Sequence, residues 1–159
     1  MNRARKAQEL FNQGYACSQA VILAFSDLID IEEEKLSKLV LPLGGGLGRL
    51  RLTCGAINSM AMVVGILFSN SESNEENKNN TYAIVQELVN RFIEENKTIN
   101  CAELLKQAEL EVQIGGKAEE RTSEYYKKRP CGKIVYSAAK ILEEFLKEKE
   151  IIWKKFYWF

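Results

Sequence analysis

The sequence predicts an all-α protein, a single-domain helical bundle of about six to seven helices. Apolar residues recur at helical spacing along most of the 159 residues, and no alternating pattern of useful length predicts a strand. Helix-capping and helix-breaking residues divide these stretches into segments. A chain of this length is most simply one domain, with enough residues to bury a core. We expect that domain to span residues 1–150 and an aromatic tail to follow at 151–159.

Three helices are expected before the first glycine-rich segment. The first covers residues 3–13 and ends at Gly14, a residue that readily adopts the left-handed conformation of a helix C-terminus. The second covers 17–28 and is mostly apolar, so we expect it to be well buried. The third covers 32–40 and is closed by Pro42, which cannot continue a helix.

The middle of the chain predicts a loop followed by a buried central helix. Residues 43–53 are rich in glycine and are expected to form a flexible loop. Thr53 is a suitable N-cap for a helix that begins at Cys54. Because residues 57–68 are apolar on almost every face, the helix near 54–68 is predicted to be enclosed at the centre of the bundle.

Further helices are expected after a polar connection. Residues 69–80 are too polar to pack and are predicted to form a loop. Helical spacing resumes over 82–95, and Asn100 is expected to cap the next helix. Residues 111–129 carry many charges and give no clear pattern, whereas Pro130 at a first helical position starts the last long helix.

Charge and composition exclude several classes of function. The 22 basic and 22 acidic residues cancel, so no overall field favours nucleic acid or an anionic membrane. The longest apolar run, 61–68, is too short to form an integral membrane segment. The first residues do not form a secretory signal, so we expect a cytoplasmic location. The absence of histidine excludes Ser-His and Cys-His catalytic pairs and HExxH zinc sites.

Each of the four cysteines stands where a helix is predicted to begin. The unpaired N–H groups of a helix start carry partial positive charge, which stabilises a thiolate, the form that attacks disulfides and binds soft metals. We therefore predict one site assembled from helix ends, and Cys54, at the head of the buried helix, is expected to be its most perturbed thiol. The predicted redox thiols or shared metal ligands are Cys17, Cys54, Cys101 and Cys131.

The spacing of these cysteines leaves the chemistry open. No CxxC pair or closely spaced ligand set is present, so a thiol–disulfide site, a zinc site and an iron–sulfur site all remain as interpretations. The cofactor and any enzymatic activity are therefore unknown, and a redox partner protein is expected for each of these sites. Cysteine is also a small hydrophobe. The alternative to a redox or metal-binding protein is therefore a non-catalytic helical binding or assembly module, in which the cysteines are only structural.

Glycines near the predicted thiol site are expected to leave room for a cofactor atom or a second sulfur. The glycine-rich run at residues 44–48 lacks the Gly-Lys-Ser/Thr ending and the preceding strand that are found in phosphate-binding loops. The neighbouring Arg49 and Arg51 suit the binding of an anion or the ionisation of a nearby thiolate, but we expect them to be solvated or paired with glutamates, with little effect on stability. The predicted cofactor-binding residues are Gly44, Gly45, Gly46, Gly48 and Gly55.

Five blocks of sequence carry a resemblance to a known family. They are Cys17-Ser18-Gln19-Ala20-Val21, Gly44-Gly45-Gly46-Leu47-Gly48, Cys54-Gly55-Ala56, Cys101-Ala102-Glu103-Leu104-Leu105 and Cys131-Gly132-Lys133-Ile134-Val135. In this order they resemble the C_GCAxxG_C_C family of redox-active proteins over about residues 15–146. The resemblance implies a small prokaryotic helical protein, associated with oxidoreductase or transporter systems, with these four cysteines as its signature.

One position departs from the family pattern. Ser59 stands where the family has glycine, and its extra hydroxymethyl group is expected to narrow any space that the glycine leaves for a backbone or cofactor. A second unusual feature is the tail, which has five aromatic residues among its last seven. Such a segment is costly to leave in water. It predicts self-packing or a homodimer, although Lys154 and Lys155 also suit a membrane surface.

Overall fold

Helices form nearly all the regular structure in residues 2–151, the part of the chain that this computed structural model describes. In chain order they are α1 (Arg3–Asn12), α2 (Cys17–Leu23), α3 (Glu33–Val40), α4 (Gly44–Leu47), α5 (Gly55–Phe68), α6 (Glu75–Asn96), α7 (Cys101–Gln107), α8 (Ser123–Lys128) and α9 (Cys131–Glu148), with short 3-10 turns at Ser26–Leu28 and Leu41–Leu43. The only β-type pairing among the described residues is an isolated bridge between Thr53 and Asn100. The all-α prediction is confirmed, with slightly more helices than the six to seven expected.

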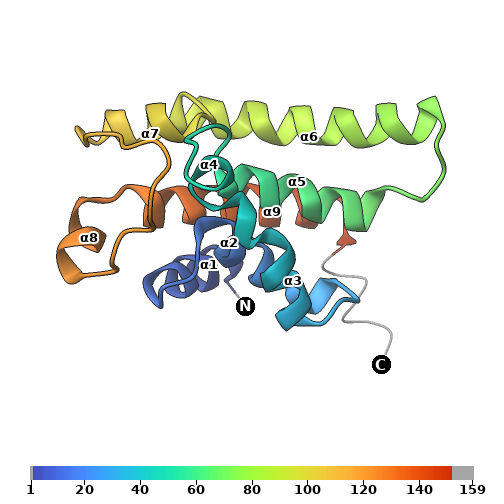
Figure 1. Cartoon of the computed structure of the whole chain (residues 1–159). Helices are drawn as coiled ribbons and strands as arrows, with labels where there is room; N and C mark the ends of the chain where they lie inside the picture. The colour runs from blue at the N-terminus through green and yellow to red at the C-terminus, as the bar shows by residue number, and fades with distance from the viewer. Residues whose placement is uncertain (1, 152–159) are drawn as a thin grey trace.

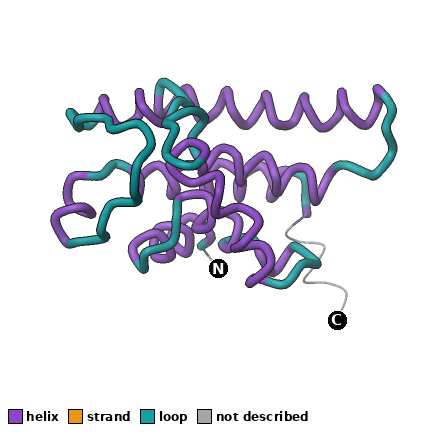
Figure 2. The backbone as a smooth tube through the Cα atoms, in the orientation of Figure 1, coloured by secondary structure: helices purple, strands orange, loops and turns teal. Residues whose placement is uncertain are grey.

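The helices lie roughly in layers (Figures 1 and 2). The long α6 runs along one side of the molecule, α5 and α9 lie beneath it, and α1, α2 and α3 lie on the opposite side. Both α5 and α9 begin at the end where α7 and α8 are found, and α6 runs back in the opposite direction. Helix α9 contacts α1, α2, α5 and α6. This arrangement brings several helix N-termini to one end of the bundle.

Local capping signals explain most helix boundaries. Gly14 follows α1 with a φ of +101°, as its predicted role at the helix end requires. The Asn100 side chain accepts a hydrogen bond from the Glu103 amide and starts α7, as predicted. Asn74 accepts in the same way from the Asn77 amide and starts α6 at residue 75. The predicted loop at 69–80 is therefore wrong over its second half, because the Asn74 cap was overlooked in a polar stretch.

The core is built chiefly by α5 and α9. The predicted central helix is α5, and its buried side includes Ile57, Met60 and Val64. Ile66, near the end of α5, is 38% exposed, so the helix is enclosed on most but not all of its faces. The buried stripe of α9 ends with Phe145 and Leu146, which are among the largest fully buried side chains. The tail prediction at 151–159 concerns residues that, after 151, lie outside the described part of the chain.

The glycine-rich segment is ordered by backbone hydrogen bonds, which corrects the prediction of a flexible loop. The Gly48 amide donates to Pro42 O at 2.7 Å, and the Leu52 amide donates to Gly46 O at 2.9 Å. Gly45 and Gly46 adopt left-handed φ angles of 66° and 69°, which interrupt the short α4. The chain therefore turns tightly where residues with a Cβ atom would be strained.

The start of α5 also differs from the prediction. Thr53 does not cap it; Cys54 is itself the N-cap residue, and Gly55 is the first helical residue. Thr53 is instead held in the isolated bridge to Asn100. None of the helices in residues 2–151 is long and apolar enough to cross a membrane.

Substituting two glycines should test the tight turn. Gly46→Ala should destabilise the protein by about 1 to 3 kcal/mol from backbone strain alone. A Cβ there would also meet the Leu52 amide nitrogen at 2.7 Å. Gly65→Ala is the matched control, since a Cβ at that helical position meets nothing within 4 Å, and it should stabilise by about 0.5–1 kcal/mol. Urea unfolding measures both, and an equally tolerated Gly46→Ala would contradict the strained turn.

Candidate functional site

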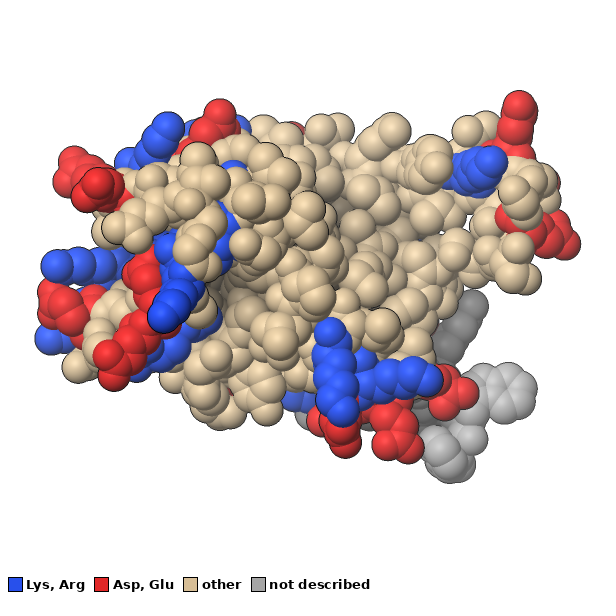
Figure 3. Space-filling model, in the orientation of Figure 1, with Lys and Arg blue, Asp and Glu red and all other residues tan. Residues whose placement is uncertain are grey.

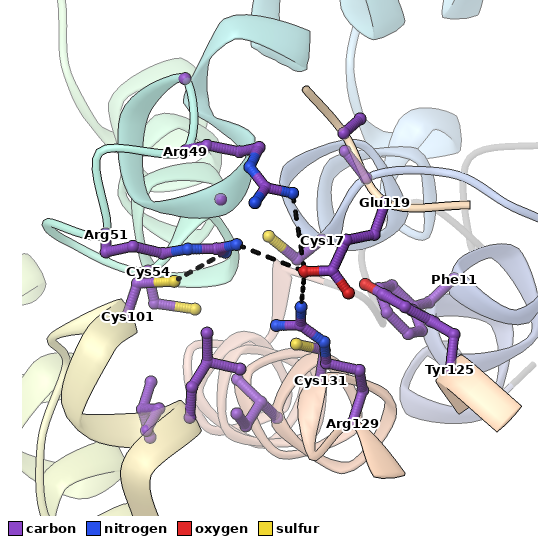
Figure 4. Close-up of a pocket in the computed structure, with 18 of the residues that line it drawn as sticks. Phe11, Cys17, Arg49, Arg51, Cys54, Cys101, Glu119, Tyr125, Arg129 and Cys131 are labelled. Atoms are coloured by element: carbon purple, nitrogen blue, oxygen red, sulfur yellow. Dashed lines mark hydrogen bonds and ion pairs between the residues drawn. The ribbon is translucent and has the colours of Figure 1, made fainter. Parts of the chain in front are cut away.

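One cavity of about 330 Å³ is lined by all four cysteines (Figure 4). Cys17, Cys101 and Cys131 are the first residues of α2, α7 and α9, and Cys54 is the N-cap of α5. Cys54 and Cys101 are buried, whereas Cys17 and Cys131 are partly buried. The structure thus places every cysteine at a helix start and brings the four helix starts together.

Backbone pairing between two distant segments fixes part of this arrangement. The Cys54 amide donates to Ile99 O at 2.8 Å, and the Cys101 amide donates to Leu52 O at 2.6 Å. These bonds surround the bridge between Thr53 and Asn100. The starts of α5 and α7 are therefore held side by side, with a cysteine on each.

The Cys17 sulfur is packed against the start of α5. A Cβ atom added to Gly55 would lie 2.8 Å from Cys17 Sγ, so only glycine allows this approach. The pKa of Cys17 is lowered to about 6, first because the Cys54 thiol donates a hydrogen bond to it. Backbone amides of Gly45, Ser18 and Gly55 add further hydrogen bonds and outweigh the cost of burial. Cys17 is therefore the thiol that ionises near neutral pH.

The pKa of Cys54 is shifted upward, whereas a reactive thiol is expected to have a lowered pKa. Its pKa is raised well above the usual value, first by the hydrogen bond that it donates to Cys17 and then by burial. It is strongly perturbed, as predicted, but it holds its proton while Cys17 carries the charge. The helix start favours a lower pKa for Cys54, but the neighbouring thiolate and the loss of water raise that pKa by more.

The other two thiols are also kept protonated. Burial raises the pKa of Cys131 to about 12, and the nearby Cys17 charge adds to the effect. Burial raises the pKa of Cys101 as well, although the Arg51 guanidinium, 3.8 Å from Cys101 Sγ, opposes it. The four sulfurs thus divide into one acidic thiol and three that retain their protons.

The residues present do not fit a four-thiolate zinc or iron–sulfur centre. Within residues 2–151, no group of three or more Cys, His, Asp or Glu side chains is arranged to hold one metal ion. Cys101 Sγ lies instead 3.8 Å from Arg51 Nη1. The described free cysteines also form no disulfide with one another.

The predicted glycines lie around the cysteines. Gly44, Gly45 and Gly48 line the cavity. A Cβ added to Gly46 would lie 2.7 Å from Cys101 Cβ. Gly46 and Gly55 therefore position Cys101 and Cys17 by close backbone approach, and Gly45 contributes an amide donor to Cys17.

An arginine cluster lines the same cavity and was not predicted. Arg49 and Arg51, expected to be solvated or paired with glutamates, pair with Glu119 and have side chains only 14% and 7% exposed. They join Arg129 around the carboxylate of Glu119, which comes from the loop between α7 and α8 (Figure 4). No short motif in the sequence signals this cluster, because residues 49–51 and 119–129 meet only through the fold.

Ser59 does not narrow the cavity. It is fully buried in α5 and is not among the residues that line the cavity. Its hydroxyl donates to Ser18 O at 2.6 Å, linking α5 to α2 one residue after Cys17. The expected obstruction is therefore replaced by a helix-to-helix hydrogen bond.

Comparison with known proteins agrees with the cysteine pattern. Residues 15–145 match the family described as "Putative redox-active protein (C_GCAxxG_C_C)". No curated protein and no solved structure matches the chain. The match covers most of the sequence and all four cysteines. The chain belongs to the C_GCAxxG_C_C family.

Proposed function

We propose that this protein exchanges electrons with disulfides, with Cys17 as the attacking thiol and Cys54 as its partner. The observation that carries this proposal is the packing of Cys17 Sγ against the start of α5, where Cys54 is the N-cap and a Cβ on Gly55 would lie 2.8 Å from that sulfur. In this position the Cys54 thiol and three backbone amides lower the pKa of Cys17. A thiol with a pKa close to ambient pH is the best attacking group in such an exchange. The pKa of about 6 at Cys17 meets this requirement.

The exchange has two steps. In the first, the Cys17 thiolate attacks one sulfur of a disulfide, the sulfur–sulfur bond breaks, and the other half leaves as a thiolate that takes up a proton. In the second, Cys54 loses its proton and attacks Cys17 Sγ, which releases the remaining half of the substrate. Two protein thiols are oxidised to a Cys17–Cys54 disulfide while one substrate disulfide is reduced to two thiols.

The order of the steps follows from the electrostatics of the pair. The negative charge on Cys17 is a main reason why Cys54 holds its proton. Once Cys17 is bound to the substrate sulfur, that charge is gone and the pKa of Cys54 falls. The second thiol therefore becomes available after the first has reacted. Cys101 and Cys131, with raised pKa values, remain protonated lining residues.

The pH dependence of alkylation should identify the ionised thiol. Iodoacetamide should modify Cys17 with half-maximal rate near its pKa of about 6, followed by a plateau at higher pH. Cys54→Ala removes the main group that lowers this pKa and should move the midpoint upward, lowering the rate at pH 6 by about fivefold for the first pKa unit and about tenfold for each further unit. Cys54→Ser keeps a hydroxyl donor and should give a smaller shift. Peptide mass spectrometry measures the rates; a wild-type midpoint above pH 8 would contradict the assignment.

Trapping should identify the disulfide that forms. After anaerobic oxidation with 2-hydroxyethyl disulfide, peptide mapping should find Cys17 linked to Cys54. In Cys54→Ser the reaction should stop at a mixed disulfide on Cys17, whereas a protein carrying Cys101→Ser and Cys131→Ser should still form the linkage. A mixed disulfide on another cysteine would refute the proposed roles. Stoichiometric iron or zinc after anaerobic purification would do so as well.

A further inference from the structure

The cavity beside Cys17 is strongly positive. Arg49, Arg51, Arg121 and Arg129 line it, and Glu119 is the only acidic side chain among its lining residues. The lining thus carries an excess of three positive charges before any thiol ionises, although the sequence as a whole is neutral. Figure 3 shows charged side chains gathered at the end of the molecule where α7 and α8 lie, beside a large uncharged face. Such a local excess attracts anions.

Three of these arginines converge on one carboxylate oxygen. Glu119 Oε1 lies 3.6 Å from Arg49 Nη1 and 3.9 Å from Arg51 Nη2, and it accepts a hydrogen bond from Arg129. The hydrogen bond from Arg129 is the main reason why the pKa of Glu119 is lowered. The guanidinium groups therefore form a cradle shaped for a carboxylate, in which the chain's own Glu119 now sits.

Two of the three arginines in the cradle, Arg49 and Arg51, are held by the backbone as well as by Glu119. Arg49 Nε donates to Gly115 O at 2.9 Å, and Arg51 Nε donates to Gln113 O at 3.0 Å. These bonds leave Arg49 Nη1 and Arg51 Nη2 facing the carboxylate, while Arg51 Nη1 lies 3.8 Å from Cys101 Sγ. Glu119 itself has a side chain 40% exposed and lies in irregular chain before α8. Another carboxylate can replace it without dismantling the cradle.

A fourth arginine adds unused hydrogen-bonding capacity. Arg121 Nη1 is the only buried side-chain nitrogen or oxygen in the described chain that lacks a hydrogen-bond partner. The guanidinium of Arg121 stacks over the rings of Phe11 and Tyr125, at 4.6 and 4.8 Å from their centroids. A buried donor left unpaired is costly, and a second anionic group in the cavity would pair with it.

The rest of the cavity fits an organic molecule. Phe11, Leu104, Leu105 and Ile134 are among its lining residues, and its volume of about 330 Å³ is in the range of small-molecule sites. A bare inorganic anion would occupy the cradle and leave these apolar walls uncovered. We propose that the cavity binds a small organic disulfide bearing carboxylates, with one carboxylate replacing Glu119 in the arginine cradle and the sulfur–sulfur bond at Cys17.

This inference rests on the proposed function, since Cys17 supplies the attacking thiolate. The reaction is the exchange already described, with the carboxylate-bearing disulfide as oxidant and two carboxylate-bearing thiols as products. The arginines take no part in the transfer of electrons. Their effect is to select the substrate and hold its sulfur within reach of Cys17.

Three disulfides of similar length and different charge test the selection. They are dithiodipropionate, 2-hydroxyethyl disulfide and cystamine, which are anionic, neutral and cationic. Their rates of reaction with the reduced protein are divided by their rates with free 2-mercaptoethanol to remove intrinsic reactivity. The anionic disulfide should exceed the neutral one by at least about tenfold, and the cationic one should be slowest. Equal corrected rates would overturn the inference while leaving thiol exchange intact.

Variants of the cradle test whether its arginines cause the preference for the anionic disulfide. Arg129→Gln and Arg51→Gln should each reduce the corrected rate of the anionic disulfide by about tenfold and leave the neutral one little changed. Arg5→Gln is the control, because it removes the same charge from an exposed position on α1. Glu119→Gln should raise the anionic rate, since it removes the competing carboxylate. An unchanged or lower rate in Glu119→Gln would contradict the replacement of that residue.

A binding measurement separates this inference from the redox chemistry. Suberate has the chain length of dithiodipropionate but no disulfide, and 1,8-octanediol is its neutral counterpart. Calorimetry should detect suberate binding to the wild-type protein and to Cys17→Ser. Arg129→Gln should bind suberate at least about tenfold more weakly. The wild-type protein should show no comparable binding of the diol. Binding of suberate by a protein with an unreactive Cys17 would refute only the proposed function. Failure of suberate to bind, or equally strong binding of sulfate, would overturn the carboxylate site.

Discussion

Bringing four helix starts to one cavity concentrates positive charge, and the rest of the site depends on how that charge is balanced. The helix starts expose N–H groups, and four arginines line the same space. Two negative groups meet this field: the Glu119 carboxylate and the Cys17 thiolate. Hydrogen bonds from the Cys54 thiol and from backbone amides lower the pKa of Cys17, whereas a hydrogen bond and the charges of nearby arginines lower the pKa of Glu119. An acidic thiol in this fold is thus a consequence of how the helices are brought together.

Glycine makes this convergence sterically possible. The turn at Gly46 needs a left-handed backbone and places the chain against Cys101, while Gly55 lets the Cys17 sulfur touch the start of α5. The backbone pairing of Cys54 with Ile99 then holds α5 beside α7. Side chains at these glycines would force the helix starts apart. The spacing of the thiols is therefore set by the backbone, and the family's glycine pattern acquires a physical reason.

Local signals in the sequence predicted the helices and the placement of the cysteines, whereas the roles of the thiols depend on distant contacts. Gly14, Asn100 and Pro130 act within a few residues of themselves, so their effects were readable along the chain. The choice of Cys17 over Cys54 depends on amides from Gly45 and Gly55, which only the fold brings to its sulfur. The arginine cradle escaped prediction for the same reason, because Glu119 meets Arg49 and Arg51 across a wide sequence separation.

Electron exchange at Cys17 would also change the charge of the cavity. In the reduced protein the Cys17 thiolate offsets one of the arginines, and its charge acts on Cys131 and Cys101. A disulfide between Cys17 and Cys54 carries no charge, so oxidation removes this offset while every arginine remains. The attraction of the cavity for an anion is then greater after oxidation than before it. Because the proposed thiol products would be anionic through their carboxylates and the oxidised cavity would be more positive, release of the last product would be the step that the arginines oppose most.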